Sequence, residues 1–374
     1  MPNPNAVVST VIRIEPPLDR PPAEMLRAER GISVELEGGR SLRLDPADAR
    51  SAGFARVLDG LCKQRLPVYI EVDPETSAIA RLLIPHVTRV VGIRPIDESM
   101  LGVELEASHA RHVLGRAAPD FDELERQLRD ALRTGTPVIL TEDDAHEIID
   151  VRGQSPGPKG SSSPFFPKPE APPRQGWPRR SIGMLLCIWR LRCWPWWWWR
   201  CMSATNAQQV FDAMSATSCA PLTVPPPCIP FLYPDDGCWA RAHEMCRLMI
   251  NMGLTPRKVW IRGNLHVITK NNPNCSVWWG WHVAPTVCVR GPGLFQAQDM
   301  VIDPSLFTTP VSKTTWKSVQ GDPNATLTNS DASDHLWGST DPNYVETNKT
   351  LAFYRLQLQN RAIQQGPPPY AHCQ

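Results

Sequence analysis

The chain has 374 residues, which is long enough for two domains. Its 39 basic and 38 acidic side chains nearly cancel, so the formal net charge of +1 gives no argument for nucleic acid as a partner, and none is expected. The 39 prolines are more than an average chain contains and indicate linkers beside the folded parts.

Residues 1–152 are predicted to form an α+β domain. Alternating apolar and polar side chains predict strands at residues 33–36, 68–72 and 88–93, and a capping pattern predicts a helix from Phe121 that ends at Gly135. We find no nucleotide-binding loop, metal-ligand spacing or catalytic constellation in this part of the chain. Its four scattered histidines are therefore expected to be structural or exposed: His86, His109, His112 and His146.

Residues 153–202 are predicted to be a linker that separates the two halves. Proline, glycine and serine are enriched as far as residue 180, which is typical of an extended and protease-accessible segment. Residues 182–201 then combine arginine with many tryptophans, and the apolar run there is too short to span a bilayer. Contact with a membrane surface and packing against one of the domains are both open for this segment.

The second half, residues 203–374, begins with a predicted helix that carries Cys238. Apolar side chains recur along it at spacings of three and four: Ala242, Met245, Met249 and Met252. Asp235 or Asp236 can cap its start, and Gly253 stands where a left-handed C-terminal cap belongs. Cys238 then lies in the first turn, where the helix dipole favours a thiolate and lowers the pKa of the thiol. This is typical of a nucleophile, and the alternative is a buried structural cysteine.

A predicted strand at residues 277–289 carries His282 on its less apolar face, among small side chains. A turn at residues 291–293 leads back into a second strand, which Asp303 follows. Counted from the turn, His282 and Asp303 are expected to lie level in an antiparallel hairpin. Opposite Cβ atoms there are ~4.5–5.5 Å apart, close enough for a carboxylate to hold one imidazole tautomer. Two alternatives remain. A bulge could shift the register, or His282 could be a surface histidine and Asp303 an aspartate that starts a turn.

Three motifs in this half resemble the bacterial protein-glutaminases, also called protein-glutamine deamidases. They read DGCWARAH at residues 236–243, WGWHVA at 279–284 and VIDPSLF at 301–307, and the resemblance covers about residues 203–373. It implies an α+β catalytic domain with a papain- and transglutaminase-like core. It also implies that Cys238 is the nucleophile, His282 the general base and acid, and Asp303 the carboxylate that orients the histidine.

The implied reaction is hydrolysis of protein-bound glutamine to glutamate with release of ammonia, through a thioester acyl-enzyme. The expected partners are proteins with accessible glutamines, and no cofactor or metal is expected. Tentative substrate-binding residues are Trp239, Trp279 and Trp281, which could instead fill the core. A transglutaminase or papain-like protease on the same triad and a non-catalytic interaction protein are the alternatives.

Cysteine usage differs between the halves, because Cys62 is alone in the first and the other ten of 11 cysteines follow residue 180. Cys219 and Cys228 are the nearest candidates for a disulfide in the catalytic core. This density predicts an oxidising location outside the cytoplasm, although no N-terminal secretory signal is seen. Delivery of the protein as a bacterial effector or toxin would explain how it reaches an oxidising location without such a signal. Residues 1–152 would then serve as a delivery or adaptor domain, or as a pro-region that covers the active site, as the resemblance suggests.

Overall fold

The computed structural model describes residues 5–28, 31–75, 78–153, 201–223, 227–291 and 296–373. The expected linker and the tryptophan-rich segment, with its possible membrane contact, lie almost wholly at residues 154–200, outside the described residues. Within the described parts of the chain, none of the helices has the length and apolar character needed to cross a membrane.

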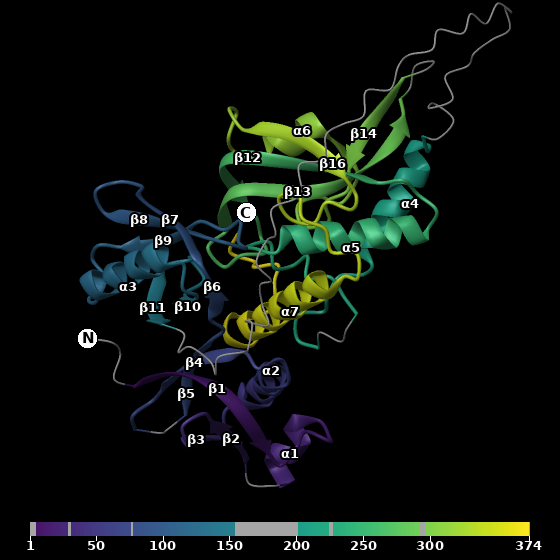
Figure 1. Ribbon diagram of the computed structural model, residues 1–374. Coiled ribbons are helices and arrows are strands. Elements are labelled where there is room, and N and C mark those ends of the chain that lie inside the picture. The colour runs from purple at the N-terminus through teal and green to yellow at the C-terminus, as the bar shows by residue number, and fades with distance from the viewer. Residues whose placement is uncertain are drawn as a thin grey trace, which may run out of the picture.

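Helices and antiparallel strands alternate in both halves, so the expected α+β class is confirmed (Figure 1). The helices are α1 Pro22–Ala28, α2 Ser51–Gln64, α3 Phe121–Thr134, α4 Ala204–Ser215, α5 Cys238–Asn251, α6 Lys313–Ser318 and α7 Val345–Gln365. The strands of the first half are β1 Ala6–Glu15, β2 Ile32–Leu36, β3 Ser41–Leu44, β4 Pro67–Val72, β5 Ile79–Leu83, β6 His86–Thr88, β7 Val90–Pro95, β8 Met100–Leu105, β9 His112–Gly115, β10 Val138–Glu142 and β11 Ile148–Gly153. Those of the second half are β12 Arg257–Ile268, β13 Ser276–Arg290, β14 Ala297–Val301, β15 Val311–Ser312 and β16 Thr326–Asp331.

The first half contains two separate hydrophobic clusters. One lies between α2 and a five-stranded sheet of order β3-β2-β1-β4-β5. The other lies under α3, against the three-stranded sheets β7-β8-β9 and β11-β10-β6. The strands expected at residues 33–36 and 68–72 are β2 and β4, while the one expected at 88–93 is divided at Arg89 between β6 and β7, which join different sheets.

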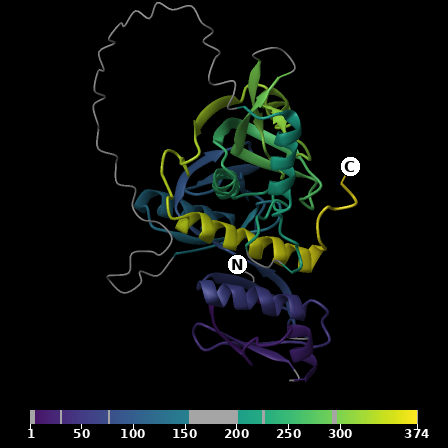
Figure 2. The ribbon, with the colours of Figure 1, turned by 90° about the vertical axis from the view of Figure 1, so that its right-hand side faces the viewer.

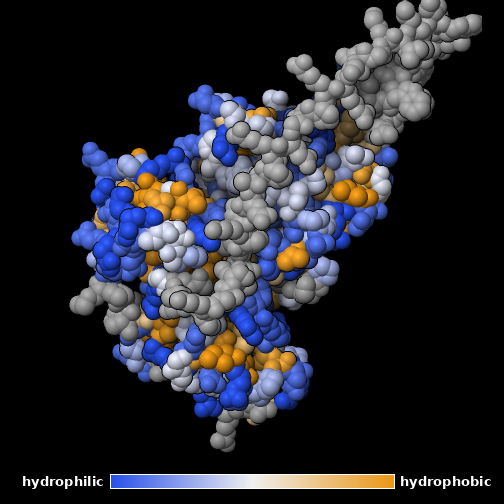
Figure 3. All heavy atoms as spheres, viewed as in Figure 1, coloured by the Kyte–Doolittle hydropathy of each residue, from blue (hydrophilic) through white to orange (hydrophobic). Residues whose placement is uncertain are grey.

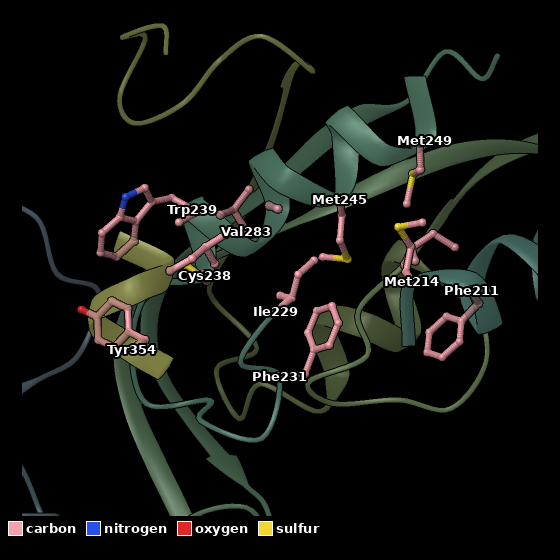
Figure 4. Packing of buried hydrophobic residues seen from close by; sticks show 14 of the residues in the cluster. Phe211, Met214, Ile229, Phe231, Cys238, Trp239, Met245, Met249, Val283 and Tyr354 are labelled. Carbon is pink, nitrogen blue, oxygen red and sulfur yellow. The ribbon is translucent and has the colours of Figure 1, made fainter. Parts of the chain in front are cut away.

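The second half is built on one antiparallel sheet of order β15-β14-β13-β12-β16. Helices α4, α5 and α7 share a hydrophobic cluster with β13, and Trp316 of α6 belongs to a second cluster on this sheet. Met245 and Met249 of α5 lie close to Phe231 and Met214 (Figure 4). Ala242, Met245 and Met249 of the predicted spacing therefore form the face that holds α5 in place, whereas Met252 follows the helix as its C-cap and is exposed.

Helix α7 lies between the purple part of the first half, which contains α2, and the green second half (Figure 2). Its Leu358 belongs to the cluster around α5, and its Leu356 belongs to the cluster around α2. Two glycines of α2 make this packing close, since a Cβ at Gly60 would lie 2.6 Å from a Leu356 methyl group and one at Gly53 would lie 2.6 Å from Ile363. One helix thus fixes α2 and its sheet against the second half.

Three disulfides form among the described residues from 201 onward: Cys201–Cys288, Cys219–Cys228 and Cys275–Cys373. The pairing expected for Cys219 and Cys228 is confirmed. Among the described cysteines, the free thiols are those of Cys62, Cys238 and Cys246. On the face drawn in Figure 3, apolar side chains form separate patches among hydrophilic ones, consistent with the balanced charge of the sequence.

Candidate active site

Cys238 is the first residue of α5 and is almost fully buried. The preceding Gly237 is the N-cap, with a φ of 80°, and a Cβ on it would lie 2.4 Å from the ring of Tyr354. The sequence predicted that Asp235 or Asp236 caps the start of α5, but neither does, because both carboxylates bind residues of other elements. Asp235 pairs with Arg361 of α7, while Asp236 accepts hydrogen bonds from the Tyr354 hydroxyl at 2.6 Å and from the Gly237 amide. Figure 4 shows Cys238 beside Tyr354 at this end of the helix.

His282 and Asp303 meet in the sheet, with 2.9 Å between His282 Nε2 and Asp303 Oδ2. The sequence predicted that the two residues lie level in the hairpin, and this is wrong. Thr286 pairs with Val301 and the Ile302 amide donates to the Pro285 carbonyl, so Asp303 lies two residues along the hairpin from His282. A two-residue offset keeps both side chains on one face of the sheet, and diagonal neighbours there remain within reach of each other.

Aromatic rings fix the His282–Asp303 pair. The ring of Trp279 stacks on His282 with 4.5 Å between centroids, and Trp316 lies 5.5 Å away. Trp316 Nε1 also donates to Asp303 Oδ2 at 2.9 Å. Burial alone would raise the pKa of Asp303, but the adjacent His282 and the hydrogen bonds from His282 and Trp316 lower it, so the carboxylate stays charged. The sequence predicted small side chains around His282, but the rings of Trp279 and Trp316 contact it instead.

His109 reaches the same site from the first half of the chain. Its Nδ1 lies 2.9 Å from Cys238 Sγ, and the residue is 1% exposed. The segment around it pairs with β13 as an added strand: Gly280 N–H donates to His109 O and Arg111 N–H donates to Trp278 O, both at 2.9 Å. The sequence interpretation of His109 as a structural or exposed residue missed this position. We find no local signal that would have revealed it, because the contact joins residues 129 positions apart.

Burial controls the protonation of both groups in this contact. Removal from solvent raises the pKa of Cys238 well above its usual range, although the backbone N–H of Val283 acts in the opposite direction. The pKa of His109 is well below its usual value because the ring is desolvated and lies near His282 and Arg241. The low thiol pKa expected from the start of a helix is thus not found in this covered state, since loss of solvent outweighs the helix dipole.

Residues 207–320 match the family model described as glutaminase. This part of the chain belongs to the glutaminase family. The resemblance and the enzyme class expected from the three motifs are confirmed over these residues. No match was found among curated proteins.

Solved structures of pro- and mature protein-glutaminases are similar to this chain. A pro-protein-glutaminase crystal structure is 23% identical and covers 78% of this chain and 99% of its own, with a TM-score of 0.48. A protein-glutaminase crystal structure is 30% identical over 42% of this chain and 90% of its own, with a TM-score of 0.37. The NMR structure of protein-glutaminase from Chryseobacterium proteolyticum is 28% identical over 46% of this chain and 97% of its own, also with a TM-score of 0.37.

The three tryptophans tentatively assigned to substrate binding surround the His109 ring in this glutaminase domain. Ring centroids lie 5.1 Å from His109 for Trp279, 5.3 Å for Trp281 and 6.2 Å for Trp239. Trp281 also contacts Trp337 at 4.7 Å, which leads outward to a surface recess of about 310 Å³. Lining residues of the recess are Trp260, Ile261, Arg262, Thr326, Thr328 and Trp337.

The other three histidines of the first half gather around one buried carboxylate, that of Glu142. His146 Nδ1 lies 2.7 Å and His86 Nε2 lies 3.2 Å from Glu142 Oε1, and His112 contacts the second oxygen. Burial opposes ionisation here, but the two imidazoles of His112 and His146 bring the pKa of Glu142 well below its usual value. Burial lowers the pKa of His146, yet Glu142 and Asp235 together raise it well above normal. These three histidines therefore have the structural role that was one of the two expected of them, and His146 Nε2 also lies 3.6 Å from Asp235 of the second half.

Proposed function

We propose that this protein hydrolyses the side-chain amide of protein-bound glutamine, with Cys238 as nucleophile, His282 as general base and acid, and Asp303 as its orienting carboxylate. The observation that carries the proposal is the buried His282–Asp303 pair beside a thiol at the start of a helix, in a segment of the glutaminase family.

The proposed reaction has two steps. The Cys238 thiol gives its proton to His282 as its sulfur bonds to the amide carbon, and backbone N–H groups at the start of α5 stabilise the oxyanion. His282 gives a proton to the leaving nitrogen, and ammonia departs from the thioester. Water then gives a proton to His282 and attacks the thioester, which releases glutamate and restores the thiol. Asp303 holds the imidazole throughout, because its charged form accepts the His282 hydrogen bond.

We further propose that residues 1–152 are inhibitory, residues 153–202 are the linker and residues 203–374 are catalytic. The support is the position of His109, whose ring occupies the space next to Cys238 where an acyl group would bind. Its backbone pairs with β13 as an extended peptide, and Cys238 is 1% exposed in this arrangement. The chain described here would therefore be latent until the linker is cut.

We propose that the substrates are proteins with exposed or flexible glutamines. The aromatic recess beside Trp337 would receive a side chain next to the glutamine, because it continues from Trp281 at the covered site. The three disulfides support export to an oxidising place, and a role as a delivered bacterial effector or toxin belongs to the same proposal.

The test is ammonia release from an unfolded protein substrate, before and after limited proteolysis of the chain between residues 154 and 180. Activity that rises on cleavage and is lost in Cys238→Ser, with glutamine converted to glutamate on intact substrate chains, is the expected result. Cut substrate chains would indicate a protease, and incorporation of an added amine would indicate a transglutaminase. No reaction under any of these conditions would favour the non-catalytic alternative, and unchanged activity after cleavage would contradict the inhibitory role.

A further inference from the structure

Three side chains around the covered thiol have the composition of a metal site. One ring nitrogen of His109, one of His282 and the sulfur of Cys238 all lie within 4.8 Å of one another, and all three residues are buried. Ligand atoms of a tetrahedral zinc site lie roughly 3.3–3.6 Å apart, given Zn–N bonds of about 2.0–2.1 Å and a Zn–S bond of about 2.3 Å. To reach that geometry, the 2.9 Å between His109 Nδ1 and Cys238 Sγ would lengthen by about 0.6 Å, and the other separations, none above 4.8 Å, would shorten by up to about 1.5 Å.

A buried nitrogen without a partner points to a missing ligand. Among the described residues around the thiol, His282 Nδ1 is buried and makes no hydrogen bond, while His109 presents Nδ1 to the site, 2.9 Å from Cys238 Sγ. Asp303 already holds the other nitrogen of His282, so Nδ1 is left with an unused lone pair on the side opposite the carboxylate. A buried polar atom without a partner is destabilising, and coordination of a cation would remove that cost.

Neighbouring residues hold His282 and His109 in place, as the neighbours of metal ligands usually do. A histidine ligand usually donates its second N–H to a carboxylate, as His282 does to Asp303, and Trp279 stacks on the ring to fix its plane. The main chain of His109 is held at both ends, by Asp236 Oδ1 on its N–H and by the Gly280 N–H on its carbonyl. A second carboxylate, that of Asp236, lies 3.1 Å from His109 Nδ1 and adds negative charge beside the site.

We propose that the uncleaved protein binds one Zn²⁺ ion through Cys238 Sγ, His109 and His282, and that this ion holds the inhibitory segment on the nucleophile. Thiolate and imidazole are preferred zinc ligands, and three protein ligands leave one position of a tetrahedral ion open. Binding displaces the thiol proton, which leaves for solvent as the Zn–S bond forms. The inference rests on the proposed function only in that Cys238 is the nucleophile.

The ion would stabilise the latent form selectively. Cleavage and departure of the first half remove His109, so the active enzyme keeps only Cys238 and His282 as ligands. Loss of a direct ligand should weaken binding by more than the ~10–100-fold that changes at outer-shell partners cost. A cation that binds only the covered form shifts the equilibrium toward that form, and its release accompanies activation.

Titration of the full-length chain with Co²⁺, with its disulfides intact, tests the proposal. One equivalent should bind and produce a thiolate-to-cobalt charge-transfer band, which Zn²⁺ then abolishes by displacement. The band should be absent in Cys238→Ser and weakened more than about 100-fold in affinity in His109→Ala. Cys246→Ser is the matched control, because it removes the other buried free thiol of the catalytic half and should leave the band unchanged.

A second measurement needs no substitution. Wild-type protein cleaved between residues 154 and 180 and freed of its first half should bind Co²⁺ more weakly than the intact chain by the same factor. Absence of the band in the intact wild type, or an equal affinity after release of the first half, would overturn the metal site. The titration does not involve ammonia, so it can fail while deamidation is normal, and it can succeed in a protein that releases no ammonia.

Discussion

At the scale of single residues, the candidate site depends on how Asp303 is held. The carboxylate is 2% exposed, accepts one hydrogen bond from Trp316, and lies 2.9 Å from His282 Nε2. Neither contact could exist if the sheet were shifted by one residue, because Asp303 would then point to the opposite face. Trp316 is therefore expected to be a positioning residue for the triad.

Trp316→Phe removes the N–H donor and keeps most of the buried ring. We expect kcat of the activated enzyme to fall about tenfold, equivalent to about 1.4 kcal/mol, with KM little changed, because Asp303 loses a donor that holds it against His282. The ammonia assay over a range of substrate concentrations measures both constants. Trp278→Phe is the control, since Trp278 is 39% exposed and stacks on His266 outside the site. Equal losses in the two variants would contradict a role specific to Trp316.

Acid is expected to loosen the covering segment, measured with a chelator present to exclude metals. The pKa of buried His109 is lowered, so below about pH 6.5 the uncovered state binds a proton that the covered state does not. The covered state then loses up to about 1.4 kcal/mol of stability per pH unit, until the pH reaches the lowered pKa. His146 acts in the opposite sense: its pKa is raised, so its contribution is complete below about pH 6.5 and is lost as the pH rises through the raised value.

Amide hydrogen exchange of residues 105–111, corrected for its intrinsic dependence on pH, would follow this change. Exchange should speed up between pH 7 and pH 5 in the wild type. It should be nearly independent of pH in His109→Gln, which keeps a polar side chain of similar reach and cannot take up the proton. A wild-type segment that becomes better protected in acid would contradict the assignment to His109.

At the scale of elements, the close packing of α2 on α7 determines how tightly the first half is held. Gly60 and Gly53 lie seven residues apart, which is about two turns, and both face α7. The helix itself gains nothing from glycine, which costs about 0.8–1.0 kcal/mol relative to alanine in a helix interior. Their value here is the approach that they allow between the two helices.

Gly60→Leu is expected to weaken this approach. A leucine side chain would collide with Leu356, at a cost of about 1–3 kcal/mol, while α2 by itself would become a better helix. The full-length variant should show faster alkylation of Cys238 and some ammonia release without cleavage. Arg56→Leu makes the same type of change on the exposed face of α2 and should have neither effect. No difference between the two variants would show that the α2–α7 contact does not maintain the covered state.

At the scale of the whole molecule, charged side chains connect the halves through α7. Arg361 pairs with Asp235 of the catalytic half and, through its Nε, with Asp144 of the first half at 2.6 Å. The histidine cluster on Glu142 lies beside this network, since His146 Nε2 is 3.6 Å from Asp235. Three sets of contacts therefore join the first half to the second: the His109 segment on β13, the packing of α2 on α7, and this polar cluster.

Asp144→Asn should weaken the connection without disturbing the catalytic half. Asp144 is partly exposed, so its loss should cost no more than about 1 kcal/mol, while Arg361 keeps its buried partner Asp235. We expect a modest rise in the activity of uncleaved protein and no change in the cleaved enzyme. Glu125→Gln removes an ion pair within α3 and serves as the control. A loss of activity in the cleaved Asp144→Asn enzyme would contradict this division of roles.

The sequence by itself determined the parts of this protein that depend on local pattern. Helical spacing placed Cys238 at the start of α5, period-two alternation placed His282 on β13, and the turn residues placed Asp303 after β14, because each pattern reflects only near neighbours in the chain. The class of the fold and the Cys219–Cys228 pair followed from the same kind of information.

Only the tertiary structure decided which distant residues meet. The two-residue offset of Asp303, the stacking of Trp279 and Trp316 on His282, and the four buried histidines all depend on packing between elements. His109 is the clearest case, because its place beside Cys238 results from backbone pairing with β13 and from the hydrogen bond of its N–H to Asp236, neither of which leaves a periodic trace around residue 109. Burial then reversed the direction expected for the pKa of Cys238, since exposure to solvent is a property of the folded whole.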